Sequence, residues 1–255
     1  MKWVFLGLAL LGLLFSVFSC TSEGEPDDAI DPAQRVVDQA IERHGSSQLK
    51  QAVLAFDFRD YHYVAKREGG TFRYERSFVD SAGRRVHDVM TNTDFTRRVD
   101  GEEMVVSDKK ANAYRNSINS VIYFASLPLA LNDPAVIKEY LGEASIKGEP
   151  YHKIKVTFRQ EGGGKDFEDE YVYWFHRDEY TMDYLAYNYR TDGGGARFRE
   201  AYHERTVQGV RFQDYYNLKP VSGTLDVVTF DSLFNTDAME QVSVIKTENV
   251  SLDLE

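Results

Sequence analysis

The sequence predicts a mainly β (α+β) protein, built as a strongly curved antiparallel sheet or open β-barrel with an N-terminal helix and a helical lid insert. Two observations predict this class. Between residues 52 and 252, apolar side chains recur mostly at every second position, in short segments separated by glycine-containing spacers. These spacers are too short for the crossovers of a dozen or more residues that parallel strands need. Two stretches, 32–44 and 115–126, instead repeat their apolar residues every three or four positions, as amphipathic helices do.

Composition narrows the class of protein further. The chain has 255 residues, 42% of them hydrophobic, which argues against disorder and allows one full-sized core. Its 41 acidic and 30 basic side chains give a net charge of -11, so we expect no nucleic-acid partner. Cys20 is the only cysteine, which excludes an internal disulfide framework and a zinc site built on several thiolates.

Residues 1–19 predict a secretory signal peptide. Lys2 precedes an apolar run over residues 4–15 that is too short for a membrane span. An ordinary signal peptide followed by a chance cysteine is the alternative. Val17-Phe18-Ser19-Cys20 resembles the lipobox of bacterial lipoproteins, with Phe18 where a small residue is usual. The resemblance implies that Cys20 carries the lipid, palmitate or another acyl chain, and anchors the protein to the outer membrane of the cell envelope, on its periplasmic face or at the cell surface.

Residues 20–30 are acidic and predict a flexible lipoprotein tether, and residues 31–255 predict a single domain that we expect to be a monomer. The acidic run also looks like the surface-export signal of Bacteroidota lipoproteins, although a plain acidic spacer explains it equally well.

The elements of the domain follow in order. Asp31 and Pro32 predict the start of a helix that runs to residue 44. Helical spacing returns from Tyr114 to residue 126, and Asp133 with Pro134 predicts a second short helix to residue 141. About eleven strands surround this insert, at residues 53–58, 61–64, 71–74, 85–89, 103–106, 151–158, 171–175, 182–189, 196–202, 209–216 and 241–252.

Several strands are apolar on both faces, which predicts cover on both sides of the sheet. Tyr173 and Phe175 alternate with Val172 and Trp174, and the helices 32–44 and 115–126 are the candidates for the second cover. An apolar pocket under the helices is the functional interpretation, and a compact core without ligand is the alternative. The side chains that we expect to contact a ligand are Tyr173, Phe175, Ile118, Val121 and Ile122.

Arg197 and Arg199 are the remaining candidate ligand-binding residues, because they share one face of a predicted strand. Together with Arg205 and Arg211, they could pair with lipid phosphates or with the acidic tether of a lipoprotein. Surface ion pairs with Glu200, Glu204 and Asp214 are the alternative.

The order of elements over residues 30–252 resembles the LolA/LolB-like lipoprotein family. The stretches 193–200 and 209–215 are similar to an uncharacterised Bacteroidota envelope lipoprotein family of this general shape. The resemblance implies lipid binding, with a role in lipoprotein or lipid sorting. Cys20 departs from the soluble LolA carriers and is closer to a LolB-type acceptor or a fixed lipid-binding protein.

The sequence offers little that indicates catalysis. Its six histidines are scattered, and we expect no metal and no cofactor. The glycine run at 162–164 lacks the spacing of a phosphate loop, and no Gly-x-Ser-x-Gly elbow is present. We therefore expect a binding protein that is not an enzyme. The alternatives are an envelope hydrolase, which would need paired carboxylates with raised pKa values, and a structural lipoprotein with a filled core.

Overall fold

The computed structural model describes residue 1 and residues 31–161, 168–190 and 193–254. Residues Asp31–Glu255 form one compact unit, separate from Met1–Ile30. The predicted signal peptide beyond Met1, the predicted tether and Cys20 lie outside the described residues. Within the described ranges, none of the helices is long and apolar enough to cross a membrane.

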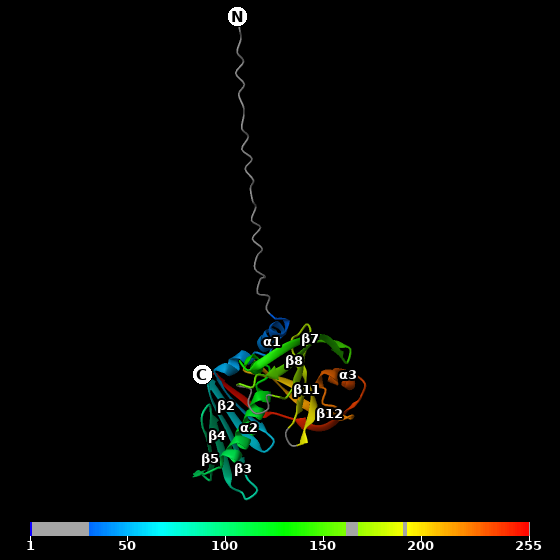
Figure 1. Ribbon diagram of the computed structural model, residues 1–255. Helices are drawn as coiled ribbons and strands as arrows, with labels where there is room; N and C mark the ends of the chain where they lie inside the picture. The colour runs from blue at the N-terminus through cyan, green and yellow to red at the C-terminus, as the bar shows by residue number, and fades with distance from the viewer. Residues whose placement is uncertain (2–30, 162–167, 191–192, 255) are drawn as a thin grey trace. The chain divides into compact units, whose positions relative to one another are not determined.

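Two seven-stranded antiparallel sheets make up the unit Asp31–Glu255, and neighbouring strands are mostly consecutive in the chain (Figure 1). The first sheet has the order β14-β1-β2-β3-β4-β5-β6. Its strands are β1 (Ala52–Phe58), β2 (Tyr61–Glu68), β3 (Thr71–Val79), β4 (Arg85–Thr91), β5 (Phe95–Val99), β6 (Glu102–Met104) and β14 (Glu248–Leu254). The period-two pattern of the sequence is confirmed as an antiparallel meander.

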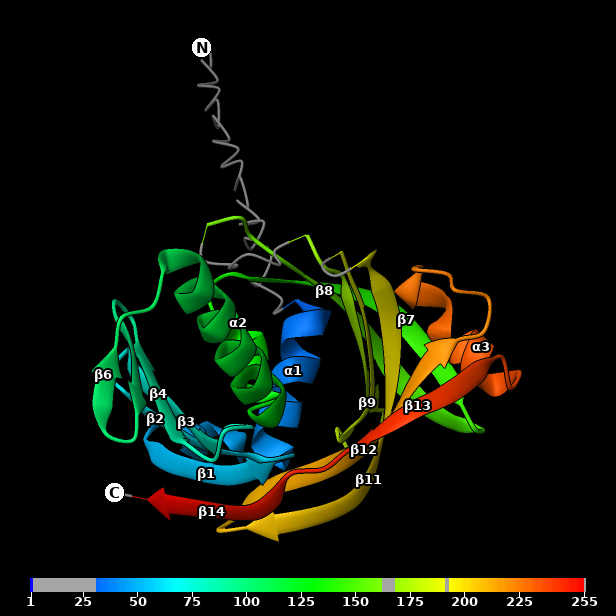
Figure 2. The same ribbon diagram turned by 90° about the horizontal axis from the view of Figure 1, so that it is seen from below.

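The second sheet has the order β13-β12-β11-β10-β9-β8-β7. Its strands are β7 (Val136–Ile146), β8 (Glu149–Phe158), β9 (Tyr171–His176), β10 (Met182–Tyr189), β11 (Gly195–Val207), β12 (Val210–Pro220) and β13 (Met239–Ile245). Two residues, Lys246 and Thr247, separate β13 from β14, so one C-terminal segment pairs first with the second sheet and then with the first (Figure 2).

Helices α1 (Pro32–Arg43) and α2 (Asp108–Ala125) lie between the two sheets (Figure 2). The Ala33 N–H donates to the Asp31 carboxylate at 2.8 Å, which caps α1 as the sequence predicts. Its apolar face packs in one core cluster with Tyr173 and Phe175 of β9. Helix α2 buries Ile118 and Ile122 against the first sheet instead. The strongly curved sheet with an N-terminal helix and a helical insert is therefore confirmed.

The middle of α2 is fixed to the first sheet by a buried charge cluster. The Asp88 carboxylate is fully buried and accepts hydrogen bonds from Arg76 and Arg97 at 2.6 Å each. Arg76 also donates to the Ser117 hydroxyl of α2 at 3.1 Å, and the Arg97 guanidinium lies 3.6 Å from the ring centre of Tyr114. This cluster holds the middle of α2, and the C-terminal end of the helix faces the second sheet.

Both faces of β9 are covered, as its sequence predicts, but an unexpected segment covers one of them. Trp174 and Val172 pack with Phe198 under the three-ten helix η4 (Val227–Thr229) and helix α3 (Phe230–Asn235). Phe230 is fully buried there, and the Trp174 indole N–H donates to the Asp231 carboxylate at 3.4 Å. Helix α1 covers the opposite face.

Three predictions of local structure are wrong. Residues 133–141, expected to form a helix, instead lead into the edge strand β7 from Val136 onward, and the short three-ten helix η2 (Leu129–Asn132) comes before them. The pairing of β7 with β8 slips between Tyr140 and Glu143, where Gly142 has a φ of 93°, and this bulge breaks the alternation of the strand. The strand expected over 241–252 is two strands, and α2 begins at Asp108, seven residues before its apolar pattern.

Candidate ligand-binding pocket

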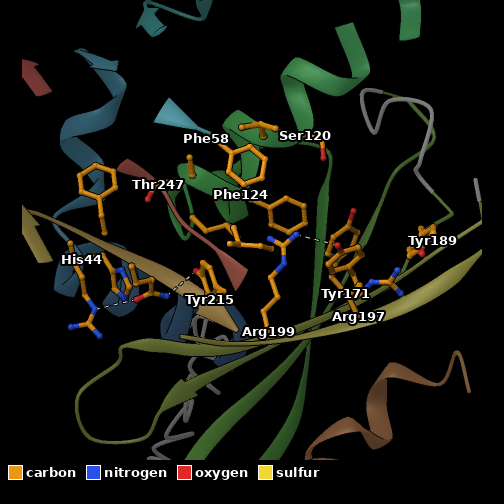
Figure 3. Close-up of a pocket in the computed structure, with 18 of the residues that line it drawn as sticks. His44, Phe58, Ser120, Phe124, Tyr171, Tyr189, Arg197, Arg199, Tyr215 and Thr247 are labelled. Carbon is orange, nitrogen blue, oxygen red and sulfur yellow. Dashed lines mark hydrogen bonds between the residues drawn. The ribbon is translucent and has the colours of Figure 1, made fainter. Parts of the chain in front are cut away.

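A pocket of about 400 Å³ lies between the C-terminal half of α2 and the second sheet (Figure 3). Helix α2 contributes Ser120, Val121, Phe124 and Ala125. The other lining residues are His44, Phe58, Leu127, Asp169, Tyr171, Tyr187, Tyr189, Arg197, Arg199, Arg211, Phe212, Gln213, Tyr215, Ile245 and Thr247. The volume lies in the usual range for small-molecule sites.

Most of the wall is apolar or aromatic. The Phe124 ring of α2 lies 5.3 Å from that of Tyr187 and 6.5 Å from that of Tyr171. The Tyr171 and Tyr187 rings stack at 5.7 Å. Tyrosine rings present an apolar face and a polar hydroxyl, so this wall suits a ligand that has both kinds of surface.

Arg199 of β11 is the most unusual residue in the pocket. Its side chain points from the strand toward Phe124, and its guanidinium lies 4.0 Å from the centre of that ring (Figure 3). One terminal nitrogen donates to the Tyr187 hydroxyl at 3.1 Å. The Nε–H is buried and finds no acceptor among the described residues, although Arg199 as a whole is only 7% exposed. A buried donor without an acceptor costs about 1–3 kcal/mol, so this arrangement needs a reason.

The other two arginines of the pocket differ in their partners. Arg211 lies 3.8 Å from the Asp183 carboxylate and 3.6 Å from that of Glu204. Arg197 donates to the carbonyl of its neighbour Ala196 at 2.8 Å. Within the part of the chain that the structure describes, neither Arg197 nor Arg199 pairs with a carboxylate, so their positive charges are not neutralised by a neighbouring acid.

His44 at the C-terminus of α1 is a structural acceptor in the pocket wall. Burial, together with the charges of Arg211 and Arg43, lowers its pKa from 6.5 to about 3. The neutral Nε2 atom accepts a hydrogen bond from the Met182 N–H at 3.1 Å. His44 therefore connects α1 to β10 and is too weak a base to exchange protons near neutral pH.

The structure brings three of the seven predicted ligand-binding residues to the pocket: Val121, Arg197 and Arg199. The other four, Tyr173, Phe175, Ile118 and Ile122, are fully buried in filled core and do not line it. Tyr173 and Phe175 share a strand face with Tyr171, but α1 packs over them and only Tyr171, at the end of the strand, reaches the pocket. Tyr173 instead shares a 2.9 Å hydrogen bond with the Tyr123 hydroxyl.

Sequence reasoning missed Phe124 and Tyr187 as lining residues. A signal was present for Phe124, because it lies three positions after Val121 and therefore on the same face of the helix. Tyr187 pairs with Arg197 across β10 and β11, a register that the sequence alone does not specify.

Two further pockets hold polar side chains. One, of about 580 Å³, is lined by Arg67 and Asp133, and the other, of about 420 Å³, by His176 and Asp183. Burial raises the pKa of both aspartates. The two aspartates line different pockets; Glu68 shares the first with Asp133, and Glu179 and Glu204 share the second with Asp183. In residues 31–161, 168–190 and 193–254 no group of three or more His, Cys, Asp or Glu side chains could hold a metal ion.

The fold and the pocket define an α+β protein in which two antiparallel sheets and a helix enclose an amphipathic pocket. Residues 9–247 match the model of the family described as a family of unknown function, DUF6503, and the chain belongs to that family. No curated protein matches the sequence.

Three solved structures are similar to this chain. A DUF1329 family protein from Desulfovibrio piger has 12% identity and a TM-score of 0.47, with 88% of this chain and 94% of that chain covered. A LolA superfamily protein from Nitrosomonas europaea has 11% identity and a TM-score of 0.46, with 88% and 93% covered. A putative outer membrane lipoprotein-sorting protein domain from Vibrio parahaemolyticus has 9% identity and a TM-score of 0.44, with 86% and 93% covered.

Proposed function

We propose that this protein is a lipid-anchored protein of the cell envelope that binds an acyl chain or another hydrophobic ligand between α2 and the second sheet. The observation that carries the proposal is the pocket of about 400 Å³ with an apolar and aromatic wall. Phe124 and Val121 of α2 face Tyr171 and Tyr187 of the sheet across it. Burying apolar ligand surface in such a pocket supplies the binding free energy.

The proposed anchor is Cys20. The apolar leader and the lipobox-like residues before this cysteine support lipidation, and multiple acyl chains would hold the protein firmly at a membrane. An anchored binding protein can receive a hydrophobic ligand or pass it on at the membrane surface. The LolA/LolB-like order of elements suggests lipid or lipoprotein sorting as the process that it serves.

Ligand binding is tested with N-phenyl-1-naphthylamine, an uncharged probe that fluoresces in apolar surroundings. We expect saturable fluorescence with the purified protein and loss of it in Ala125→Phe, which fills the pocket. Ala113→Phe is the matched control, because Ala113 is exposed on the same helix and does not line the pocket. Equal binding by both variants would contradict the proposed site.

Native mass spectrometry after gentle extraction provides a second test, with a bound lipid mass as the expected result. A protein that neither carries lipid nor takes it up counts against the proposal. The anchor is tested separately by incorporation of labelled palmitate in cells, which should occur in the wild type and be lost in Cys20→Ser.

A further inference from the structure

The pocket concentrates positive charge in a protein that is acidic as a whole. The chain carries 41 acidic and 30 basic side chains, yet the described lining residues include three arginines and one carboxylate, Asp169. An excess of guanidinium groups inside a cavity attracts anions and repels cations, and low-dielectric walls strengthen both effects. The charge of this pocket therefore restricts which hydrophobic ligands fit it.

The arginines do not contribute equally. Arg211 already lies near Asp183 and Glu204. Arg199 is 7% exposed, pairs with no carboxylate among the described residues, and leaves its Nε–H without an acceptor. Arg197 lies two positions away on the same face of β11, likewise without a carboxylate in the described part of the chain. Arg199 is therefore the donor available to a ligand, and Arg197 adds a second positive charge.

The surroundings of Arg199 combine polar and apolar groups. Its guanidinium stacks on Phe124 at 4.0 Å, so the apolar wall begins directly beside the charge. The Tyr187 hydroxyl accepts a hydrogen bond from Arg199 at 3.1 Å, which leaves the hydrogen of that hydroxyl free to donate to the same ligand. Two donors next to an aromatic wall match a ligand whose anionic end is continuous with an apolar chain.

We infer that the ligand is an acyl chain that ends in an oxyanion, a carboxylate or a phosphate, and that this end binds to Arg199. The inference rests on the proposed function, because it places the acyl chain in the same pocket. The Arg199 guanidinium donates to an oxyanion oxygen, and the Tyr187 hydroxyl donates to the same group. Guanidinium groups suit this role because they stay charged and match the geometry of carboxylate and phosphate oxygens.

The test is displacement of N-phenyl-1-naphthylamine from the wild-type protein by single-chain compounds of equal length: decanoate, decyl phosphate, decanol and decyltrimethylammonium. Decanoate, decyl phosphate or both should displace the probe at concentrations at least about tenfold below those of decanol, with the cation weakest. Inorganic phosphate alone is included, and displacement by it at the same concentrations as decyl phosphate would overturn the inference in favour of a site for a free anion.

Arg199→Met keeps the length of the side chain but removes its charge and donors. We expect this variant to lose the preference for the anions, about tenfold, while its affinity for decanol is unchanged. Arg159→Met is the matched control, because Arg159 is exposed and lies outside the pocket. It should behave as the wild type.

The outcomes separate the two proposals. If decanol displaces the probe as well as both anions do in the wild type, the head-group inference fails and the hydrophobic site stands. If the probe itself does not bind, the proposed function fails. The wild-type series decides the question even if Arg199→Met does not fold.

Discussion

Asp88→Asn should be among the most destabilising conservative substitutions in this protein. The carboxylate is fully buried and accepts bonds from Arg76 at 2.6 and 3.1 Å and from Arg97 at 2.6 and 2.8 Å. The two arginine side chains are themselves only 7% and 11% exposed. The amide would leave two nearly buried cations without a counter-ion. Removing one partner of a buried ion pair costs about 3–5 kcal/mol, a large part of the roughly 5–15 kcal/mol that stabilises a domain.

The assay is urea unfolding followed by circular dichroism, with Glu75→Gln as the matched control. Glu75 lies on β3, next to Arg76, and its side chain is 23% exposed. It lies 2.7 Å from both Arg73 and His87, so the control also replaces a paired carboxylate with an amide, at a less buried site. The control should lose less than about 1 kcal/mol, as exposed pairs do. Equal losses for the two variants would refute the argument that burial makes the Asp88 cluster expensive to break.

Four further substitutions test other parts of the fold by the same unfolding assay. The folded pKa of His44, about 3, lies below its ordinary 6.5, so the unfolded chain takes up the proton first. The free energy of unfolding should therefore fall below pH 6.5, by about 1.4 kcal/mol per pH unit, and His44→Gln should remove that part of the slope; identical slopes would contradict this. Gly45→Ala should cost about 2 kcal/mol or more, because its φ is 61° and the new Cβ would lie 2.2 Å from the Gly209 carbonyl oxygen. Gly69 also has a positive φ, 55°, but no atom lies within 4 Å of a Cβ added there, so Gly69→Ala should cost about half as much. A larger loss at Gly69 than at Gly45 would count against the argument that the Gly209 carbonyl oxygen makes Gly45→Ala costly. Phe230→Ala should cost about 3–5 kcal/mol, because the ring is fully buried over the second sheet; a loss below about 1 kcal/mol would mean that α3 is not part of the core.

The sequence predicted those parts of the fold in which local pattern and tertiary structure agree. The Asp31 cap and the apolar repeat of α1 are local features, and most strands alternate because one side of each strand faces the core. The start of strand β7 was mistaken for a helix because Asp133 followed by Pro134 is typical of a helix start. The way in which η4 and α3 cover the second sheet depends on long-range packing onto Trp174. A helix of six residues shows little periodicity in the sequence, so this cover was not predicted.

The same limit applies to the pocket. The sequence placed Arg197 and Arg199 on one face of a strand and offered Glu200 and Asp214 as ion-pair partners. In the structure Glu200 pairs with Lys147, whereas Asp214 pairs with Arg205 and Glu204 lies 3.6 Å from Arg211, as the ion-pair alternative predicts for those two arginines. Alternation explains this outcome, because Arg199 faces the pocket while Phe198 and Glu200 belong to the other face of β11. Which acids surround an arginine depends on sheet register and on neighbouring strands, so an unpaired Arg199 could be identified only in the structure.

The two walls of the pocket are held with different strength, and this difference indicates where a ligand enters. The sheet wall is covered on both faces, and residues 172–175 of β9 are all fully buried. Helix α2 has only two fully buried residues, Ile118 and Ile122, both in its C-terminal half, and the Asp88 cluster contacts its middle at Tyr114 and Ser117. Local opening is easiest where the fewest buried contacts are lost. Helix α2 is therefore the wall that we expect to move when the proposed ligand enters, while the sheet keeps Arg199 in place.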